Sequence, residues 1–256
     1  MDSVFLQQRN FFVLNIIGVC ANTQSKCLEE IMALPKEPVS ATVSFVGIPA
    51  VISAKENCRC AEVYNAVTYV AIDGMPIVKK ARKAGIDCER CSGPEMMQLI
   101  LEKSVQEGKT HYFYGGANIQ VLNALQKNLE EKFPGIQIVG MYSPPFRPLT
   151  EEEDAKLCEE INECKPDFVW VGIGAPKQDI WMMEHCERIN GTVMLGVGAA
   201  FDFFAGTLDK APEWVAQSGF EWLYRLMKEP KRLWRRYVLG GFKYLYYSVE
   251  AKLKKK

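Results

Sequence analysis

The sequence lacks the features by which several large protein classes are recognised. It has no uncharged apolar stretch of 18 residues, and its first residues lack the basic start, apolar run and cleavage site of a secretory signal. We therefore expect neither a spanning helix nor secretion, so contact with a membrane would be peripheral. Its glycines match neither the dinucleotide-binding fingerprint nor the P-loop. This argues against a Rossmann-type oxidoreductase.

Histidine is also scarce, since only His111 and His185 could supply imidazole to a metal. The nine cysteines are odd in number and scattered, which is typical of free thiols in a reducing cytoplasm rather than of a disulfide framework. Cys88 and Cys91 have the spacing of a zinc or redox motif, but no second pair stands at a suitable distance. We favour small buried residues there, and expect no metal and no cofactor.

Short apolar runs alternate with helical patterns along the chain. Seven runs are rich in Val, Ile and aromatic residues, as buried strands are: Phe11–Val19, Val43–Ile48, Val67–Ile72, His111–Tyr114, Ile136–Val139, Phe168–Ile173 and Val193–Val197. Helical patterns between them include one that begins at Pro94, one over Asn118–Lys132, and one that begins with a capping box at Thr150. The alternation predicts an α/β fold with a Rossmann-like, mainly parallel sheet and helices on both faces.

Charge divides the chain, although its formal net charge is zero. Residues 225–256 hold eleven Lys or Arg and two Glu, a net of +9, which leaves about −9 on the rest. Because this segment is also aromatic, it can be attracted to an anionic membrane surface and place its rings in the interface. A solvated basic helix that closes the fold is the plainer interpretation. We predict an α/β domain over residues 1–210 and a basic, aromatic, helical appendage over residues 211–256.

Five loops after predicted strands carry glycine, proline or polar residues, at the places where the chemistry of such sheets gathers. They are Asp73-Gly74, Gly115-Gly116 and residues 142–148, 174–179 and 196–202. Glycine there lets backbone N–H groups approach a phosphate at a helix N-terminus. Each loop alone is weak evidence for a binding site, since Asp73 could cap the helix that starts near Pro76 and Gln178 could be a first-turn polar residue. Their combination indicates a binding site.

Seven motifs, taken in order, resemble those of the WecG/TagA/CpsF glycosyltransferases, glycosyltransferase family 26. They are Asp73-Gly74-Met75-Pro76, Arg90-Cys91-Ser92-Gly93-Pro94-Glu95, Tyr112-Phe113-Tyr114-Gly115-Gly116, Tyr142-Ser143-Pro144-Pro145-Phe146, Gly174-Ala175-Pro176-Lys177-Gln178, Gly198-Ala199-Ala200-Phe201-Asp202 and Glu221-Trp222-Leu223-Tyr224-Arg225. The resemblance covers nearly the whole chain. It implies an inverting, metal-independent transfer of a sugar, N-acetylmannosamine or a related hexose, from a UDP-sugar to a polyprenyl-diphosphate-linked acceptor. The implied setting is cell-envelope or exopolysaccharide synthesis, at the cytoplasmic face of the membrane.

The resemblance also implies roles for individual residues. Asp73 matches the family's proposed general base, Gln178 a polar residue of the pocket, and Arg90 a basic position near it. Three residues match C-terminal arginines thought to hold diphosphate: Arg225, Arg232 and Arg235. Further substrate contacts are expected at Gly115, Gly116, Gly198 and Asp202, although Asp202 could equally order its loop or cap a helix.

Elementary chemistry agrees with these roles. Inverting transfer needs a base for the proton of the acceptor hydroxyl, and a carboxylate at a strand end is placed to be one. The leaving diphosphate gains negative charge, which N–H groups and fixed cations can meet. The tail arginines are spaced by seven and three residues, so on one helix they would share a face.

Two matters stay open at this point. Phe45-Val46-Gly47 stands where many members of the family have Thr-x-Asn, with Ser44 as the nearest hydroxyl, so the identity of the sugar is undecided. The alternative is a membrane-surface or nucleic-acid-binding α/β protein without transferase activity. We expect no nucleic acid partner, because the acidic body would repel a phosphate backbone. The sequence does not decide whether the chain forms a homo-oligomer.

Overall fold

The computed structural model of the chain describes residues 9–209, 211–212, 215 and 220–253. Its main sheet has six strands, all parallel, in the order β4-β3-β8-β7-β5-β6. These are β3 (Ala41–Val46), β4 (Tyr69–Ile72), β5 (Thr110–Gly115), β6 (Gln137–Tyr142), β7 (Phe168–Gly172) and β8 (Val193–Gly196). The predicted parallel sheet is confirmed, and the carboxyl ends of the six strands therefore lie along one edge.

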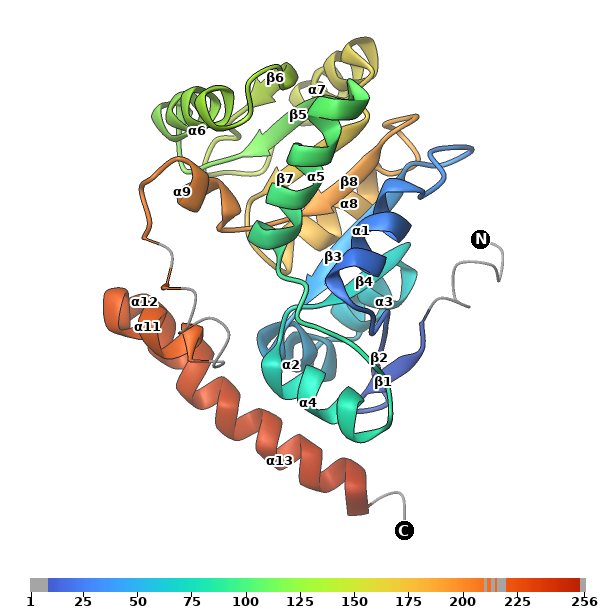
Figure 1. Cartoon of the computed structure of the whole chain (residues 1–256), viewed down its shortest axis with the longest axis vertical. Coiled ribbons are helices and arrows are strands. Elements are labelled where there is room, and N and C mark those ends of the chain that lie inside the picture. Colours follow the sequence, from blue (N-terminus) through green and yellow to red (C-terminus); the bar gives the residue numbers. More distant parts are fainter. Residues whose placement is uncertain (1–8, 210, 213–214, 216–219, 254–256) are drawn as a thin grey trace.

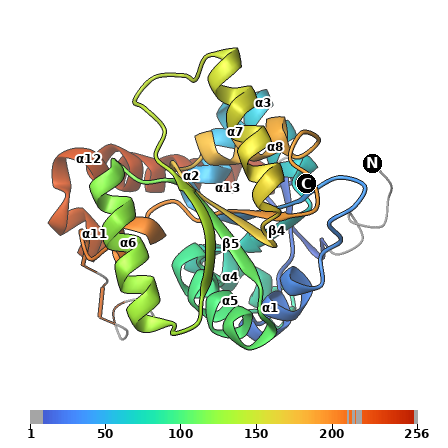
Figure 2. The same ribbon diagram turned by 90° about the horizontal axis from the view of Figure 1, so that it is seen from above.

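Helices cover both faces of the sheet, as the sequence predicted. They are α1 (Gln24–Met32), α2 (Ile48–Glu56), α3 (Cys58–Ala66), α4 (Met75–Lys83), α5 (Gly93–Glu107), α6 (Ile119–Lys132), α7 (Glu151–Cys164), α8 (Lys177–His185) and α9 (Ala200–Phe204). Figure 2 shows α7 and α8 on one side of the sheet and α1 and α5 on the other. Successive side chains of β4 pack on opposite faces of the sheet, since Tyr69 belongs to one apolar cluster and Val70 to another.

Local capping chemistry explains where several helices begin. Thr150 and Ser92 each form a capping box with a Glu three residues later, at the starts of α7 and α5. The side chain of Asn118 accepts a hydrogen bond from the backbone N–H of Val121 and caps α6. The helix starts predicted near Pro94, Asn118 and Thr150 are therefore confirmed.

The apolar run Phe11–Val19 is not one buried strand, so this prediction is wrong. It forms β1 (Phe11–Val13) and β2 (Ile17–Val19), an antiparallel hairpin outside the main sheet. Leu14 and Asn15 make the turn with positive φ angles of 52° and 58°. Asn tolerates this left-handed conformation, but the apolar residues on either side hide the turn from a pattern of hydrophobicity.

The tail forms α11 (Glu221–Lys228), α12 (Pro230–Trp234), the π-helical turn η2 (Arg235–Leu239) and α13 (Gly240–Leu253). Figure 1 shows α13 running alongside α2 and α4. Polar bonds hold it there: Glu56 accepts from Lys243 at 2.7 Å and from Tyr247 at 2.9 Å, and Lys80 donates to Ser248 at 2.8 Å.

The described helices include none that is long and apolar enough to cross a bilayer. The predicted boundary between residues 210 and 211 stays a prediction, because residue 210 lies outside the described part of the chain.

We predict that Gly115→Ala destabilises the protein by about 2 to 4 kcal/mol, because strain and overpacking combine. Gly115 has a φ of +142°, and a Cβ there would lie 2.7 Å from the backbone of Gly172 on β7. Urea unfolding measures the loss. The control is Gly85→Ala, where φ is +84° and no atom lies within 4 Å of the added carbon. Strain alone costs about 1 to 2 kcal/mol there, so equal losses in the two variants would contradict the close approach of β5 and β7.

Candidate active site

Asp73 stands at the carboxyl edge of the sheet, directly after β4. Its backbone N–H donates to the carbonyl of Val46 at 3.0 Å, which ties the end of β4 to the end of β3. The next helix, α4, has Gly74 as its N-cap and no side-chain capping bond. Asp73 therefore does not cap this helix, and its carboxylate is available for other partners.

Arg90 is the partner that organises the site. Its Nη1 lies 2.6 Å from Oε2 of Glu221 and 3.6 Å from Oδ1 of Asp73, and its Nη2 lies 2.6 Å from Oε1 of Glu95. The arginine side chain is only 15% exposed. One guanidinium thus faces three carboxylates, so negative charge is in excess around it.

This environment raises the pKa of Asp73 to about 7. Desolvation by the surrounding protein is the main cause, and the nearby carboxylates of Glu221 and Glu95 add to it, while Arg90 and Arg225 act in the opposite direction. The side chain nevertheless keeps 34% of its surface open to solvent. A carboxyl group that is accessible and titrates near neutral pH is suited to proton transfer.

Arg225 adds a second cation beside Asp73 from α11. Its guanidinium lies 5.5 Å from the centre of the Phe203 ring. Its Nε is buried and has no hydrogen-bond partner among the described residues. A buried N–H without a partner is costly, so this position suits an anionic ligand that would accept from it.

A pocket of about 430 Å³ lies where the tail meets the carboxyl edge of the sheet. Its lining includes the first turn of α2 at Pro49 and Ala50, and the loop after β7 at Ala175 and Pro176. Three cationic side chains line it from the tail: Arg235, Arg236 and Lys243. Only Arg235 was predicted, and the density of Lys and Arg in the tail is the signal that could have indicated the other two.

A buried polar group lies beside this pocket. Tyr64, which lines the pocket, donates to Oδ2 of Asp179 at 3.2 Å, and Ser44 donates to Oδ1. Burial raises the pKa of Asp179 to about 6, although both hydrogen bonds oppose the rise. The hydroxyl of Ser44, which stands near the departure Phe45-Val46-Gly47, is therefore engaged within the protein.

The predicted tail arginines do not share one helix, so this expectation is wrong. Arg225 lies on α11, which ends at Lys228, whereas Arg235 begins η2. Pro230 starts a separate helix, because a proline lacks the N–H that a continuing helix would need. Arg232 lies on α12, and its side chain is outside the part that the structure describes.

Gln178 braces the loops that follow two strands. It is 4% exposed, its Oε1 accepts from the N–H of Gly174 at 3.1 Å, and its Nε2 donates to the carbonyl of Gly196 at 2.6 Å. The loops after β7 and β8 are thus held together by one amide. Its predicted contact with substrate stays a prediction.

The other predicted residues lie on the same edge of the sheet. Gly116 donates its N–H to the carbonyl of Gly172 at 3.3 Å, and Gly198 has a φ of +54° after β8. Asp202 lies on α9, and its carboxylate is 3.5 Å from the hydroxyl of Thr207. The structure brings these residues together on one edge, but their contacts with substrate stay predictions.

A separate pocket, of about 450 Å³, is formed by the loops after β5 and β6. It includes Asn118 and Ile119 at the start of α6 and Tyr142–Phe146 from the fourth motif. Phe146, which lines this pocket, is 96% exposed. The fourth motif therefore forms part of a pocket at the β6 end of the carboxyl edge of the sheet.

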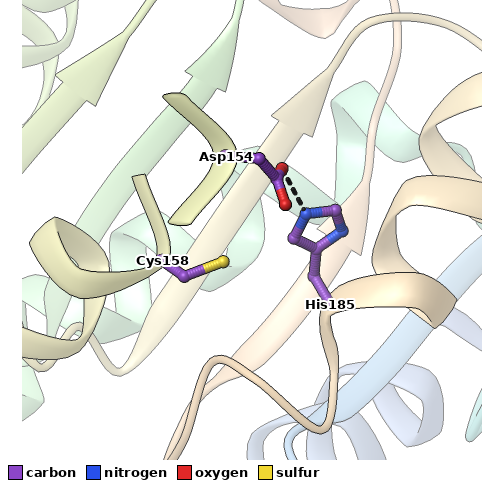
Figure 3. A group of neighbouring side chains, drawn as sticks. All are labelled: Asp154, Cys158 and His185. Carbon is purple, nitrogen blue, oxygen red and sulfur yellow. Dashed lines mark hydrogen bonds and ion pairs between the residues drawn. The ribbon is translucent and has the colours of Figure 1, made fainter. Parts of the chain in front are cut away.

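One group of side chains has the spacing of metal ligands, namely Asp154, Cys158 and His185 between α7 and α8 (Figure 3). Their ligand atoms lie within 4.8 Å of one another. Asp154 already binds two cationic or polar partners, Nε2 of His185 at 2.8 Å and the guanidinium of Arg188. Nδ1 of His185 lies 2.7 Å from the carbonyl of Trp181. These hydrogen bonds and ion pairs explain why the three side chains lie together: they link α7 to α8.

Cys88 and Cys91 are both buried, as we favoured from the sequence, and they contact different partners. Sγ of Cys91 lies 3.1 Å from Sγ of Cys27, and Cys88 lies against the carbonyl of Val78. All nine cysteines are free thiols.

Comparison with known proteins confirms the resemblance seen in the motifs. The sequence profile described as the glycosyl transferase WecG/TagA/CpsF family matches residues 13–256. The chain is 31% identical over 195 residues to the N-acetylglucosaminyldiphosphoundecaprenol N-acetyl-beta-D-mannosaminyltransferase of Staphylococcus aureus strain MW2, covering 76% of this chain and 74% of that protein. A protein of the same name from Bacillus spizizenii is 29% identical over 184 residues, covering 72% of this chain and 69% of that protein.

We predict that Asp73→Asn stabilises the protein against unfolding at pH 8. The folded-state pKa of about 7 lies above the ordinary value of 3.8, so the folded state favours the protonated carboxyl. The stabilisation that comes from protonation of Asp73 in the folded state is complete below pH 4 and is lost as the pH rises through 7. Because a third of the side chain reaches solvent, we expect a gain of only about 1 to 2 kcal/mol.

Urea unfolding at pH 4 and at pH 8 measures this gain. The control is Asp209→Asn, since Asp209 is 72% exposed and paired with Lys228. A gain for Asp73→Asn that is as large at pH 4 as at pH 8 would contradict the raised pKa.

Proposed function

Because the chain belongs to the WecG/TagA/CpsF family of glycosyltransferases, we propose that it moves a hexose, N-acetylmannosamine or a related sugar, from a UDP-sugar to a polyprenyl-diphosphate-linked N-acetylglucosamine. The names of its Staphylococcus and Bacillus relatives support this acceptor and this sugar. The observation that carries the proposal is Asp73, an accessible carboxyl with a pKa near 7 at the carboxyl edge of a parallel sheet.

In the proposed reaction, Asp73 acts as the general base of an inverting transfer. The hydroxyl oxygen of the acceptor attacks C1 of the sugar, its proton passes to the Asp73 carboxylate, and the bond from C1 to the diphosphate oxygen breaks. A base with a pKa near the working pH is ionised for a large part of the time and still binds a proton well. Water could also attack C1 of the sugar in an open crevice and hydrolyse the donor, so a closed and acceptor-filled site favours transfer.

In this proposal, cations of the tail meet the charge of the leaving diphosphate. Arg235, Arg236 and Lys243 line the pocket beside α2, and Arg225 holds an unpartnered Nε near Asp73. The start of α2 adds the positive end of a helix dipole, because Gly47 caps it without a side-chain bond. The volume of about 430 Å³ is within the usual range of small-molecule sites.

The outer face of α13 supports a peripheral contact with the membrane that carries the acceptor. Its exposed apolar residues are Phe242, Leu245, Tyr246, Val249 and Leu253, each more than half exposed. The opposite face is docked, with Tyr244 only 4% exposed. An apolar face flanked by lysines matches an interfacial helix on an anionic surface. We propose that residues 211–256 act as this membrane-contacting appendage, at the cytoplasmic face.

We predict that Asp73→Asn lowers sugar transfer by about 10²- to 10⁴-fold, the usual contribution of a general base. Transfer is measured in vesicles with a panel of UDP-sugars and polyprenyl-diphosphate-linked N-acetylglucosamine. UDP binding, measured by calorimetry, should change little, because the variant keeps the cations of the pocket. Asp209→Asn should retain transfer. Turnover by Asp73→Asn at the rate of the intact chain would contradict the assignment of Asp73 as the base.

We predict that Leu245→Asp weakens binding to anionic vesicles by about tenfold or more, because an exposed apolar side chain can no longer be buried in the interface. Co-sedimentation with vesicles measures the binding. The matched control is Phe12→Asp, since Phe12 is 59% exposed on β1 rather than on the tail. Equal binding by the two variants would argue against α13 as the contact surface.

A further inference from the structure

Nη1 of the Arg90 guanidinium is shared unequally between two carboxylates. Glu221 takes the short contact to Nη1, at 2.6 Å, and Asp73 is left at 3.6 Å from the same nitrogen. The second terminal nitrogen, Nη2, is occupied by Glu95 at 2.6 Å. Asp73 is therefore the most distant of the three carboxylates around this cation.

Glu221 reaches this cation from the tail. It begins α11, whereas Arg90 lies in the loop before α5, 131 residues earlier in the chain. Its side chain is 25% exposed, so the bond forms at a partly closed interface between α11 and the loop. The position of α11 therefore decides which carboxylate receives the short bond from Nη1.

The charges that face Asp73 come from three segments. Arg90 precedes α5, Glu95 lies on α5, and Glu221 and Arg225 lie on α11. Two cations and two other carboxylates thus surround Asp73 and balance one another. Without the charge of Glu221 the cations would be in excess, and Nη1 of Arg90 would be free to approach Asp73.

We infer that Glu221 is a positioning residue of the active site: by taking the short bond to Arg90, it keeps this cation from a close ion pair with Asp73 and leaves Asp73 able to accept a proton. The inference rests on the proposed role of Asp73 as the base. It follows that docking of α11 couples the tail to the strength of the base. A tail displaced from the loop would leave Arg90 paired with Asp73 and the base weakened.

The first test is the pKa of the Asp73 carboxyl, measured by carbon NMR in the full chain labelled at aspartate and assigned with Asp73→Asn. In Glu221→Gln, which keeps the size and hydrogen-bonding reach of the side chain, we expect this pKa to fall by about 1 to 2 units. Asp209→Asn removes a carboxylate whose partner is Lys228, not Arg90, so it should leave the pKa unchanged. An unchanged or raised pKa in Glu221→Gln overturns the inference.

The second test is the pH dependence of transfer. Glu221→Gln should move the acid limb of kcat/KM to lower pH and lower the plateau above pH 8, by less than about tenfold for each unit of pKa. The two profiles should therefore approach or cross on the acid side. If Glu221 only stabilised α11, the limb would stay in place while the whole profile fell, and this outcome also overturns the inference.

The two tests separate this inference from the proposed function. The NMR titration needs no substrate. A fall in the Asp73 pKa in Glu221→Gln therefore supports the competition between Glu221 and Asp73 for Arg90 even if no sugar is transferred. Transfer that is lost in Asp73→Asn, together with an Asp73 pKa that does not respond to Glu221→Gln, would leave the base assigned and Glu221 without this role. Thermal unfolding of Glu221→Gln confirms that both measurements are made on folded protein.

Discussion

The ion-pair cluster of Arg90 is the interaction on which the site depends. It joins three segments that are remote in the sequence: the strand end at Asp73, the start of α5 at Glu95 and the start of α11 at Glu221. Desolvation at this cluster, together with the charges of Glu221 and Glu95, raises the pKa of Asp73 to about 7, against the opposing effect of Arg90 and Arg225. The same contacts hold α11 in place and so set Arg225 over the ring of Phe203. In the proposed reaction, proton transfer and charge neutralisation are thereby linked in one arrangement.

The sheet supplies the rigid frame for this cluster. Because all six strands are parallel, every strand end lies on one edge, and the loops there are held by bonds within the protein. Gln178 clamps the loops after β7 and β8, and Gly115 allows β5 and β7 to approach closely. The tail then closes over this edge with cations on its inner side and apolar residues on its outer side. A site arranged in this way would be complete only where the tail is docked.

Local chemistry in the sequence predicts much of this architecture. The capping boxes at Ser92 and Thr150 and the alternation of apolar runs with helical patterns depend on neighbouring residues, and the structure confirms them. The position of Asp73 after a strand was likewise visible. The pairing of Arg90 with Glu221 was not, because 131 residues separate them and no local pattern specifies the contact. The hairpin turn at Leu14 and Asn15 was hidden by its apolar flanks, and the shared helical face failed because Pro230 divides the tail.

The role of Asp73 as the base is tested most directly by the configuration of the new glycosidic bond. In the proposed reaction a single base activates the acceptor hydroxyl, which attacks from the side opposite the leaving diphosphate, so each transfer would invert C1 of the sugar. NMR of the lipid-linked product, read from the one-bond carbon–proton coupling at C1, distinguishes the two configurations. With Asp73 as the base of a direct displacement, we expect a β-linked sugar from an α-linked UDP-sugar. An α-linked product would mean that the configuration is retained, and it would contradict the role of Asp73 as the base in a direct displacement.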